Sequence, residues 1–229
     1  MPRNVEHLER SVAIPPSGII GDLTIPIQAS GVVIFAHGTG SSRLSSRNRF
    51  VASVLHKAGL ATLLLDLLTA EEAEIDFRTR HLRFDIDLLA NRLVEATKWV
   101  MDDAEIGRLP LGYFGASTGA AAALIAAALL PEQIRGVVSR GGRADLAGTA
   151  LPKVKAPTLL IVGGNDYPVV ALNKNALNEL KCEKKLEIIP GATHLFEESG
   201  ALEQVAGFAT NWFEGYLAGK SYARTATSV

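Results

Sequence analysis

Apolar residues fall into short continuous runs along the chain, and longer segments with helical spacing lie between them. Each run is bounded by Gly, Pro or Asp, which is typical of strands buried on both faces of a largely parallel sheet. Six runs predict core strands, at 31–36, 61–66, 111–115, 135–139, 158–162 and 186–189. The less apolar segments 5–14 and 19–25 flank a turn-like Pro15-Pro16-Ser17-Gly18 and predict an antiparallel ribbon at one edge, which makes about eight strands.

The segments between the runs predict helices that cover both faces of this sheet, at 46–58, 84–101, 118–130, 169–180 and 201–217. In the second helix, apolar residues recur every three or four positions and are expected to form one buried face: Phe84, Leu88, Leu89, Leu93 and Ala96. The charged stretch 69–83 is longer than most strand-to-helix connections, and we expect it to overhang the site. No long insertion follows the strand 135–139, so no large lid domain is expected.

Composition narrows the class of protein. The chain has 229 residues, 48% of them hydrophobic and 21% charged, which suits one sizeable core. We expect a single α/β domain over 1–219 and a poorly ordered tail over 220–229. The formal net charge of -1 argues against nucleic acid or an anionic membrane as a partner. A single cysteine, Cys182, together with the lack of a signal peptide or a 20-residue apolar stretch, favours a cytoplasmic location.

A candidate nucleophile lies between the strand 111–115 and the alanine-rich helix after it. Gly115-Ala116-Ser117-Thr118-Gly119 matches G-x-S-x-G in the strand, turn and helix context that this motif requires. Small residues on both sides of Ser117 allow a tight, strained turn that exposes the hydroxyl, and the helix N-terminus adds a positive field. The alternative is a serine that only caps the helix.

A serine nucleophile needs a base and an acid that orients the base. Asp166 follows the strand 158–162, and His194 follows the strand 186–189. Each therefore comes just past the carboxyl end of a successive strand. Alone, Asp166 could be a helix cap and His194 a loop residue, and Asp145 is a competing acid after the preceding strand.

The loop after the strand 31–36 reads His37-Gly38-Thr39-Gly40-Ser41-Ser42. Its glycines leave backbone N–H groups open to a ligand, so the amides of Thr39 and Thr118 are the candidate oxyanion hole, with Gly40 as the alternative to Thr39. A phosphate-binding turn is the competing interpretation, but neither G-x-G-x-x-G nor a G-K-[ST] ending is present.

With these motifs the chain resembles the α/β-hydrolase superfamily, and in particular the dienelactone hydrolase-like group of small enzymes without a lid, over 5–217. The resemblance implies a single-domain α/β-hydrolase fold and the chain order Ser117, Asp166, His194 for a catalytic triad. Dienelactone hydrolases proper have a cysteine at the position of Ser117, so their activity on dienelactone is not carried over. The resemblance implies a serine esterase or a related acyl hydrolase.

Several arginines follow strand ends, on the rim where ligands bind in open α/β sheets. The candidate substrate-binding residues are Arg43, Arg78, Arg80, Arg83, Arg140 and Arg143. They could form a positive mouth for an anionic ester, because guanidinium groups bind carboxylates in a bidentate way. Alternatively they pair with nearby acids such as Glu71, Asp76 and Asp145 and brace the loops.

These observations predict an acyl hydrolase of the carboxylic ester type that needs no cofactor and no metal. Ser117 is the expected nucleophile, His194 the general base and acid, and Asp166 the orienting acid. The expected substrates are small esters or lactones, with no nucleic acid or membrane as partner. The alternatives are a binding protein without catalysis on the same fold, or an acyltransferase or perhydrolase with the same triad.

Overall fold

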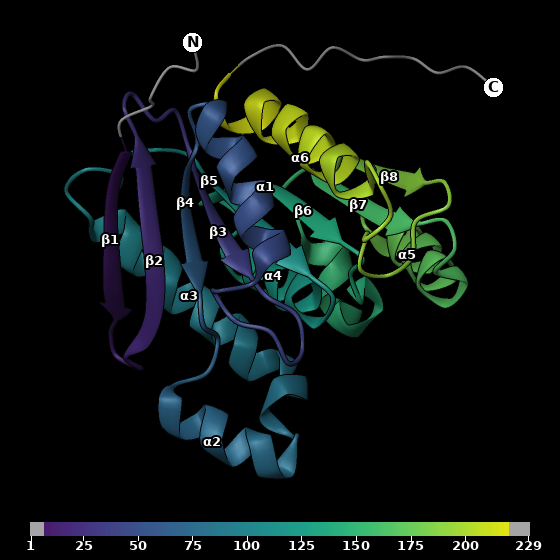
Figure 1. Cartoon of the computed structure of the whole chain (residues 1–229), viewed down its shortest axis with the longest axis horizontal. Coiled ribbons are helices and arrows are strands. Elements are labelled where there is room, and N and C mark those ends of the chain that lie inside the picture. The colour runs from purple at the N-terminus through teal and green to yellow at the C-terminus, as the bar shows by residue number, and fades with distance from the viewer. Residues whose placement is uncertain (1–6, 220–229) are drawn as a thin grey trace.

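The computed structural model describes residues 7–219, which form an eight-stranded sheet between two layers of helices (Figure 1). The strand order is β1-β2-β4-β3-β5-β6-β7-β8. β2 runs antiparallel to both of its neighbours, and β3 to β8 pair in parallel. The strands are β1 (His7–Ile14), β2 (Ile19–Pro26), β3 (Val32–Ala36), β4 (Ala61–Leu65), β5 (Leu111–Ala116), β6 (Ile134–Arg140), β7 (Thr158–Gly163) and β8 (Lys184–Ile189).

The helices divide the core into two apolar layers. α1 (Ser46–Lys57) and α6 (Ala201–Leu217) cover one face, and α3 (Ile86–Asp102), α4 (Thr118–Leu129) and α5 (Tyr167–Glu179) cover the other. α4 is buried almost all round because its alanines let it lie close to the sheet. The remaining elements are α2 (Ala70–Thr79) and two 3-10 segments, η1 (Leu82–Phe84) and η2 (Ala144–Lys153).

The predicted α/β architecture is confirmed, with six core strands, an antiparallel ribbon and five helices at the expected places. Residues 69–83 were expected to form a connection, whereas the structure forms α2 there, with a capping box between Thr69 and Glu72 at its start. The expectation for Phe84 was wrong: it lies in η1, before α3, and is 57% exposed. The predicted tail, 220–229, lies outside the described residues.

The fold brings the candidate chemistry to one edge. Because β3, β5, β6, β7 and β8 run in parallel, their carboxyl ends share one edge of the sheet, and the loops that follow them meet there. α2 lies apart from the two helix layers, below the carboxyl ends of β3 and β4 in Figure 1. Over residues 7–219, no helix has the length and apolar character that crossing a membrane requires.

Candidate active site

Ser117 lies in a strained turn between β5 and α4. Its backbone has φ 50° and ψ -122°, a conformation that costs a non-glycine residue about 1–3 kcal/mol. The turn is pinned from β6, because the Ser117 N–H donates to the carbonyl of Arg140 (3.2 Å) and the Ser117 carbonyl accepts from the N–H of Arg143 (3.0 Å). The Ser117 side chain makes no capping hydrogen bond to α4. The geometry therefore does not match a serine that serves as a helix cap.

Glycines around the turn allow the close approach that the motif predicts. A Cβ atom on Gly115 would lie 2.4 Å from the Cα of Ala120, and one on Gly119 would lie 2.4 Å from the carbonyl oxygen of Ala36. A Cβ atom on Gly38 would lie 2.8 Å from the Cβ of Ser117. The loop after β3 thus lies directly against Ser117, with no space for any larger residue at position 38.

His194 and Asp166 come together at the ends of β8 and β7. The Nδ1 atom of His194 lies 2.6 Å from Oδ2 of Asp166, whose side chain is 14% exposed. The two loops are held side by side by backbone bonds, including Asn165 N–H to the carbonyl of Ala192 (2.9 Å). Asp166 is the residue before α5, yet its side chain makes no capping bond to that helix. Its carboxylate is directed to the imidazole instead.

The competing acid, Asp145, has a different partner. Its two oxygens accept hydrogen bonds from Nε and Nη2 of Arg143 at 2.9 and 2.8 Å. Within residues 7–219, the structure shows no hydrogen bond between Asp145 and His194, and none between the hydroxyl of Ser117 and His194. Catalytic bonds of the second kind are often long before substrate binds.

The two candidate oxyanion residues are neighbours. The hydroxyls of Thr39 and Thr118 lie 2.9 Å apart, which ties the loop after β3 to the start of α4. His37, which the sequence analysis gave no role, supports this loop: its Nδ1 lies 2.9 Å from the carbonyl of Gly38, and its Nε2 accepts from the N–H of Leu67 at 3.1 Å. Burial lowers the pKa of His37, so the neutral ring that this pattern requires is favoured.

A cavity of about 740 Å³ adjoins these two threonines. Its floor includes Thr39 and Thr118, and α2 forms its roof with Ala73 and Phe77 among the lining side chains. The cavity residues on α2 were missed because 69–83 was not predicted to be helical. The pattern Thr69-x-x-Glu72 was the available signal, since it is a capping-box sequence.

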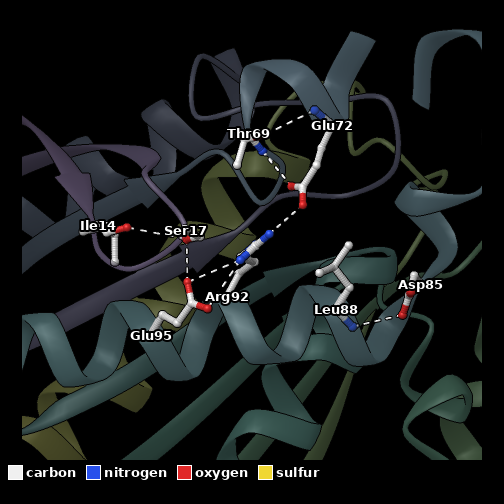
Figure 2. A network of polar contacts seen from close by, with 8 residues as sticks. All are labelled: Ile14, Ser17, Thr69, Glu72, Asp85, Leu88, Arg92 and Glu95. Atoms are coloured by element: carbon white, nitrogen blue, oxygen red, sulfur yellow. Dashed lines mark hydrogen bonds and ion pairs between the residues drawn. The ribbon is translucent and has the colours of Figure 1, made fainter. Parts of the chain in front are cut away.

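Figure 2 shows the polar network that holds the roof in place. Arg92 of α3 donates through Nη2 to Glu72 of α2 (2.6 Å) and through Nη1 to Glu95 (3.3 Å). Glu95 accepts a bond of 2.5 Å from Ser17, in the turn between β1 and β2. The only buried residue of α2 is Asp76, which pairs with Nε of Arg83 at 2.5 Å. Ion pairs rather than an apolar interface therefore attach α2 to the rest of the protein.

The candidate arginines are mostly braced by acids. Arg43 pairs with Asp66 and Asp22, Arg83 with Asp76, Arg78 with Glu74, and Arg143 with Asp145. Only Arg43 and Arg83 line the cavity. Arg80 is an exposed residue at the end of α2, with φ 57°. The alternative in which the arginines brace loops thus describes four of the six.

Arg140 has no acid beside it among the described residues. Its side chain is buried on the α1 side of the sheet, with Nη2 3.5 Å from Oδ1 of Asn48 and the guanidinium 6.0 Å from the ring centre of Phe196. Burial, and then the nearby charge of Arg47, lower its pKa to about 10. Arg140 does not line the cavity. Also within residues 7–219, no three His, Cys, Asp or Glu side chains cluster as a metal site would require.

Comparisons with known proteins agree with this architecture. A crystal structure of a dienelactone hydrolase from Anabaena variabilis is 60% identical, with a TM-score of 0.90 over 94% of this chain and 100% of that one. The structure of Est1E from Butyrivibrio proteoclasticus shares the fold at 16% identity, with a TM-score of 0.73 over 91% of this chain and 99% of that chain.

Curated relatives from Mycobacterium tuberculosis, provisionally named phosphoribosyl transferases, are 54% identical over 211 residues. The match covers 92% of this chain and 47% of theirs, so the chain spans about half the length of these relatives. The family model for the dienelactone hydrolase family matches residues 19–217, nearly all of the described chain. The chain therefore belongs to the dienelactone hydrolase family.

Proposed function

We propose that the protein is a serine-dependent acyl hydrolase that cleaves small carboxylic esters. The observation that carries the proposal is the 2.6 Å contact between His194 and Asp166, at the same sheet edge as the strained Ser117 turn. A nucleophile, a base and an acid that orients the base are the groups that acyl transfer to serine requires.

In the first half of the reaction, Oγ of Ser117 bonds to the ester carbonyl carbon while its proton passes to Nε2 of His194. The carbonyl electron pair moves onto oxygen, and the N–H groups of Thr39 and Thr118 stabilise that oxyanion. The bond from carbon to the alcohol oxygen then breaks, and the proton on Nε2 passes to the departing alcohol. Asp166 accepts a hydrogen bond from Nδ1 throughout and stabilises the imidazolium.

In the second half, water replaces the alcohol and repeats these steps in reverse order. His194 takes a proton from water, and the resulting hydroxide oxygen bonds to the acyl carbon. The bond from that carbon to Oγ of Ser117 then breaks, and the proton on Nε2 passes to Oγ as the acid is released. Activity on dienelactone is not carried over into the proposal, because this chain has Ser117 where dienelactone hydrolases proper use cysteine. It also does not extend to phosphoribosyl transfer, because the named relatives are about twice as long as the matched segment.

A fluorophosphonate probe followed by peptide mass spectrometry tests the proposal, together with hydrolysis of p-nitrophenyl acetate. The wild type should be labelled at Ser117 and turn over the ester. Ser117→Ala should lose labelling and about 10³-fold or more of kcat, with residual catalysis from the oxyanion hole. Ser53→Ala, on the exposed side of α1, is the matched control and should keep both. Labelling without turnover would favour a binding protein, and labelling elsewhere would refute the assignment of the nucleophile.

A further inference from the structure

The cavity beneath α2 is lined by the two candidate oxyanion residues but not by the proposed triad. Thr39 and Thr118 line it, whereas Ser117, Asp166 and His194 do not. A substrate bound for attack at Ser117 can therefore extend from the oxyanion hole into this cavity, toward α2. The volume of about 740 Å³ lies within the range of small-molecule pockets.

The chemistry decides which half of an ester occupies that room. The tetrahedral intermediate carries four groups: Oγ of Ser117, the oxyanion, the departing alcohol and the acyl substituent. The alcohol oxygen must lie next to His194 to receive its proton, and His194 lies outside the cavity lining. The oxyanion faces the two threonine amides at the cavity floor. The acyl substituent is then the group left to extend into the cavity.

The lining shows which acyl groups fit. Apolar side chains line the cavity from three parts of the fold: the ribbon of β1 and β2, the segment 68–77 that contains most of α2, and α3. These side chains are Ile20, Leu68, Ala70, Ala73, Phe77 and Leu89. They offer a surface for an aliphatic or aryl group. Phe77 is 81% exposed even though it lines the cavity, so this aromatic ring has apolar area free to cover a bound ligand.

The charged groups in the lining do not favour an anion. Two arginines, Arg43 and Arg83, face three carboxylates, those of Asp66, Glu71 and Asp76. Both arginines already pair with carboxylates of the protein, Arg43 with Asp66 and Arg83 with Asp76. A carboxylate on the substrate would have to share these arginines with Asp66 or Asp76, and it would meet more negative than positive charge in the lining.

We propose that the cavity beneath α2 is the acyl pocket of the enzyme and that it selects an uncharged, largely apolar acyl group. The inference rests on the proposed function, since it assigns the acyl half of an ester that Ser117 attacks. Of the two alternatives that the sequence left open for the arginines, it favours loop bracing and a neutral ester. It also makes α2, which has no apolar anchor of its own, the element that sets acyl selectivity.

The test places a bulky side chain on α2 so that it fills part of the cavity. Ala73 is exposed on the cavity side of α2, so Ala73→Trp adds volume without disturbing a core. Ile75→Trp, on the same helix but outside this lining, is the matched control. kcat/KM is measured for p-nitrophenyl acetate and octanoate, and for the acetates of methanol and 2-phenylethanol. Phe77→Ala, which removes an exposed wall without adding bulk, is the second variant.

Ala73→Trp should lower kcat/KM for the octanoate by about tenfold or more and leave the acetate esters within about twofold. Phe77→Ala should also weaken the preference for octanoate over acetate, and Ile75→Trp should change neither. If Ala73→Trp slows the 2-phenylethyl ester and spares the octanoate, the cavity holds the alcohol and the proposal is wrong. Unchanged selectivity in both Ala73→Trp and Phe77→Ala would also overturn it, while Ser117 labelling would leave the proposed function standing.

A second arm tests the charge preference. For the wild type, p-nitrophenyl pentanoate should react at least tenfold faster than the glutarate monoester, which has the same chain with a terminal carboxylate. Faster reaction of the glutarate monoester at low salt would show that Arg43 or Arg83 is available to an anion, and the neutral acyl pocket would be refuted.

Discussion

Asp166→Asn separates catalysis from stability, because the structure gives this carboxylate one partner and no capping role. Oδ2 accepts from Nδ1 of His194 at 2.6 Å, and no capping bond joins the side chain to α5. An amide whose NH₂ group faces Nδ1 forces that nitrogen to act as an acceptor. The ring proton then sits on Nε2, which can no longer take the proton from Ser117.

The size of the effect follows from this tautomer. Loss of the orienting acid lowers kcat by up to about 10⁴-fold in serine enzymes, which corresponds to about 5.5 kcal/mol at 1.36 kcal/mol per tenfold. A lost helix cap would instead cost about 1 kcal/mol of folding free energy with little effect on rate. Since Asp166 makes no capping bond, the free energy of unfolding should change by less than that.

The assay combines p-nitrophenyl acetate turnover with urea denaturation, and Asp145→Asn is the matched control. Asp145 is partly buried and held by Arg143, so its replacement should keep turnover within about twofold and cost about 1 kcal/mol of stability. An Asp166→Asn variant with near wild-type kcat would refute the reasoning. An inactive Asp145→Asn variant with native stability would transfer the orienting role to Asp145.

Three further predictions test the surrounding structure. Gly38→Ala places a Cβ atom 2.8 Å from that of Ser117, so kcat should fall at least tenfold, whereas Gly207→Ala, with open space around it, should keep the rate; equal rates would contradict the packing argument. Arg92→Met removes the cation that joins Glu72 of α2 to Glu95 of α3, so backbone amides at 70–79 should exchange hydrogen faster at a stability cost of at most about 3 kcal/mol, and unchanged exchange would show that the pair of Asp76 and Arg83 is a sufficient anchor. Burial, and then the charge of His7, lower the pKa of His56 to about 4 from 6.5. The unfolded chain therefore binds more protons between these pH values, so stability should fall as pH drops from 6.5 to 4, and urea denaturation of His56→Gln should show a shallower slope than the wild type.

Local sequence patterns were enough to predict the sheet and most of its helices. Strands buried on both faces must be apolar throughout, and covering helices must be apolar on one side. The continuous apolar runs and the helical spacing are therefore both visible in the sequence. The placement of Ser117, Asp166 and His194 at one sheet edge was also predicted from local patterns. Each follows a predicted strand, and parallel strands bring their carboxyl ends to one edge whatever the loops do. The structure places Nδ1 of His194 2.6 Å from Oδ2 of Asp166 at that edge.

The helix α2 shows where pattern alone was insufficient. Its apolar residues do not form a buried stripe, because Ile75 and Phe77 are 50% and 81% exposed. A helix held by ion pairs leaves no hydrophobic period in the sequence. The error at Phe84 is of the opposite kind. Its spacing fits the helical period of the buried face, but the residue belongs to η1, which ends before α3 begins.

Which charges neutralise each other was decided only by the tertiary structure. Arg43 meets Asp66 across 23 positions and Arg92 meets Glu72 across 20, so neither pair can be inferred from neighbours in the chain. The sequence by itself determined the strands, the helices that cover the sheet and the sheet edge at which the candidate triad lies, because burial and strand direction are encoded locally. The partners of the arginines, the roof over the cavity and the sign of its charge depend on distances between remote segments, and only the folded chain sets those distances.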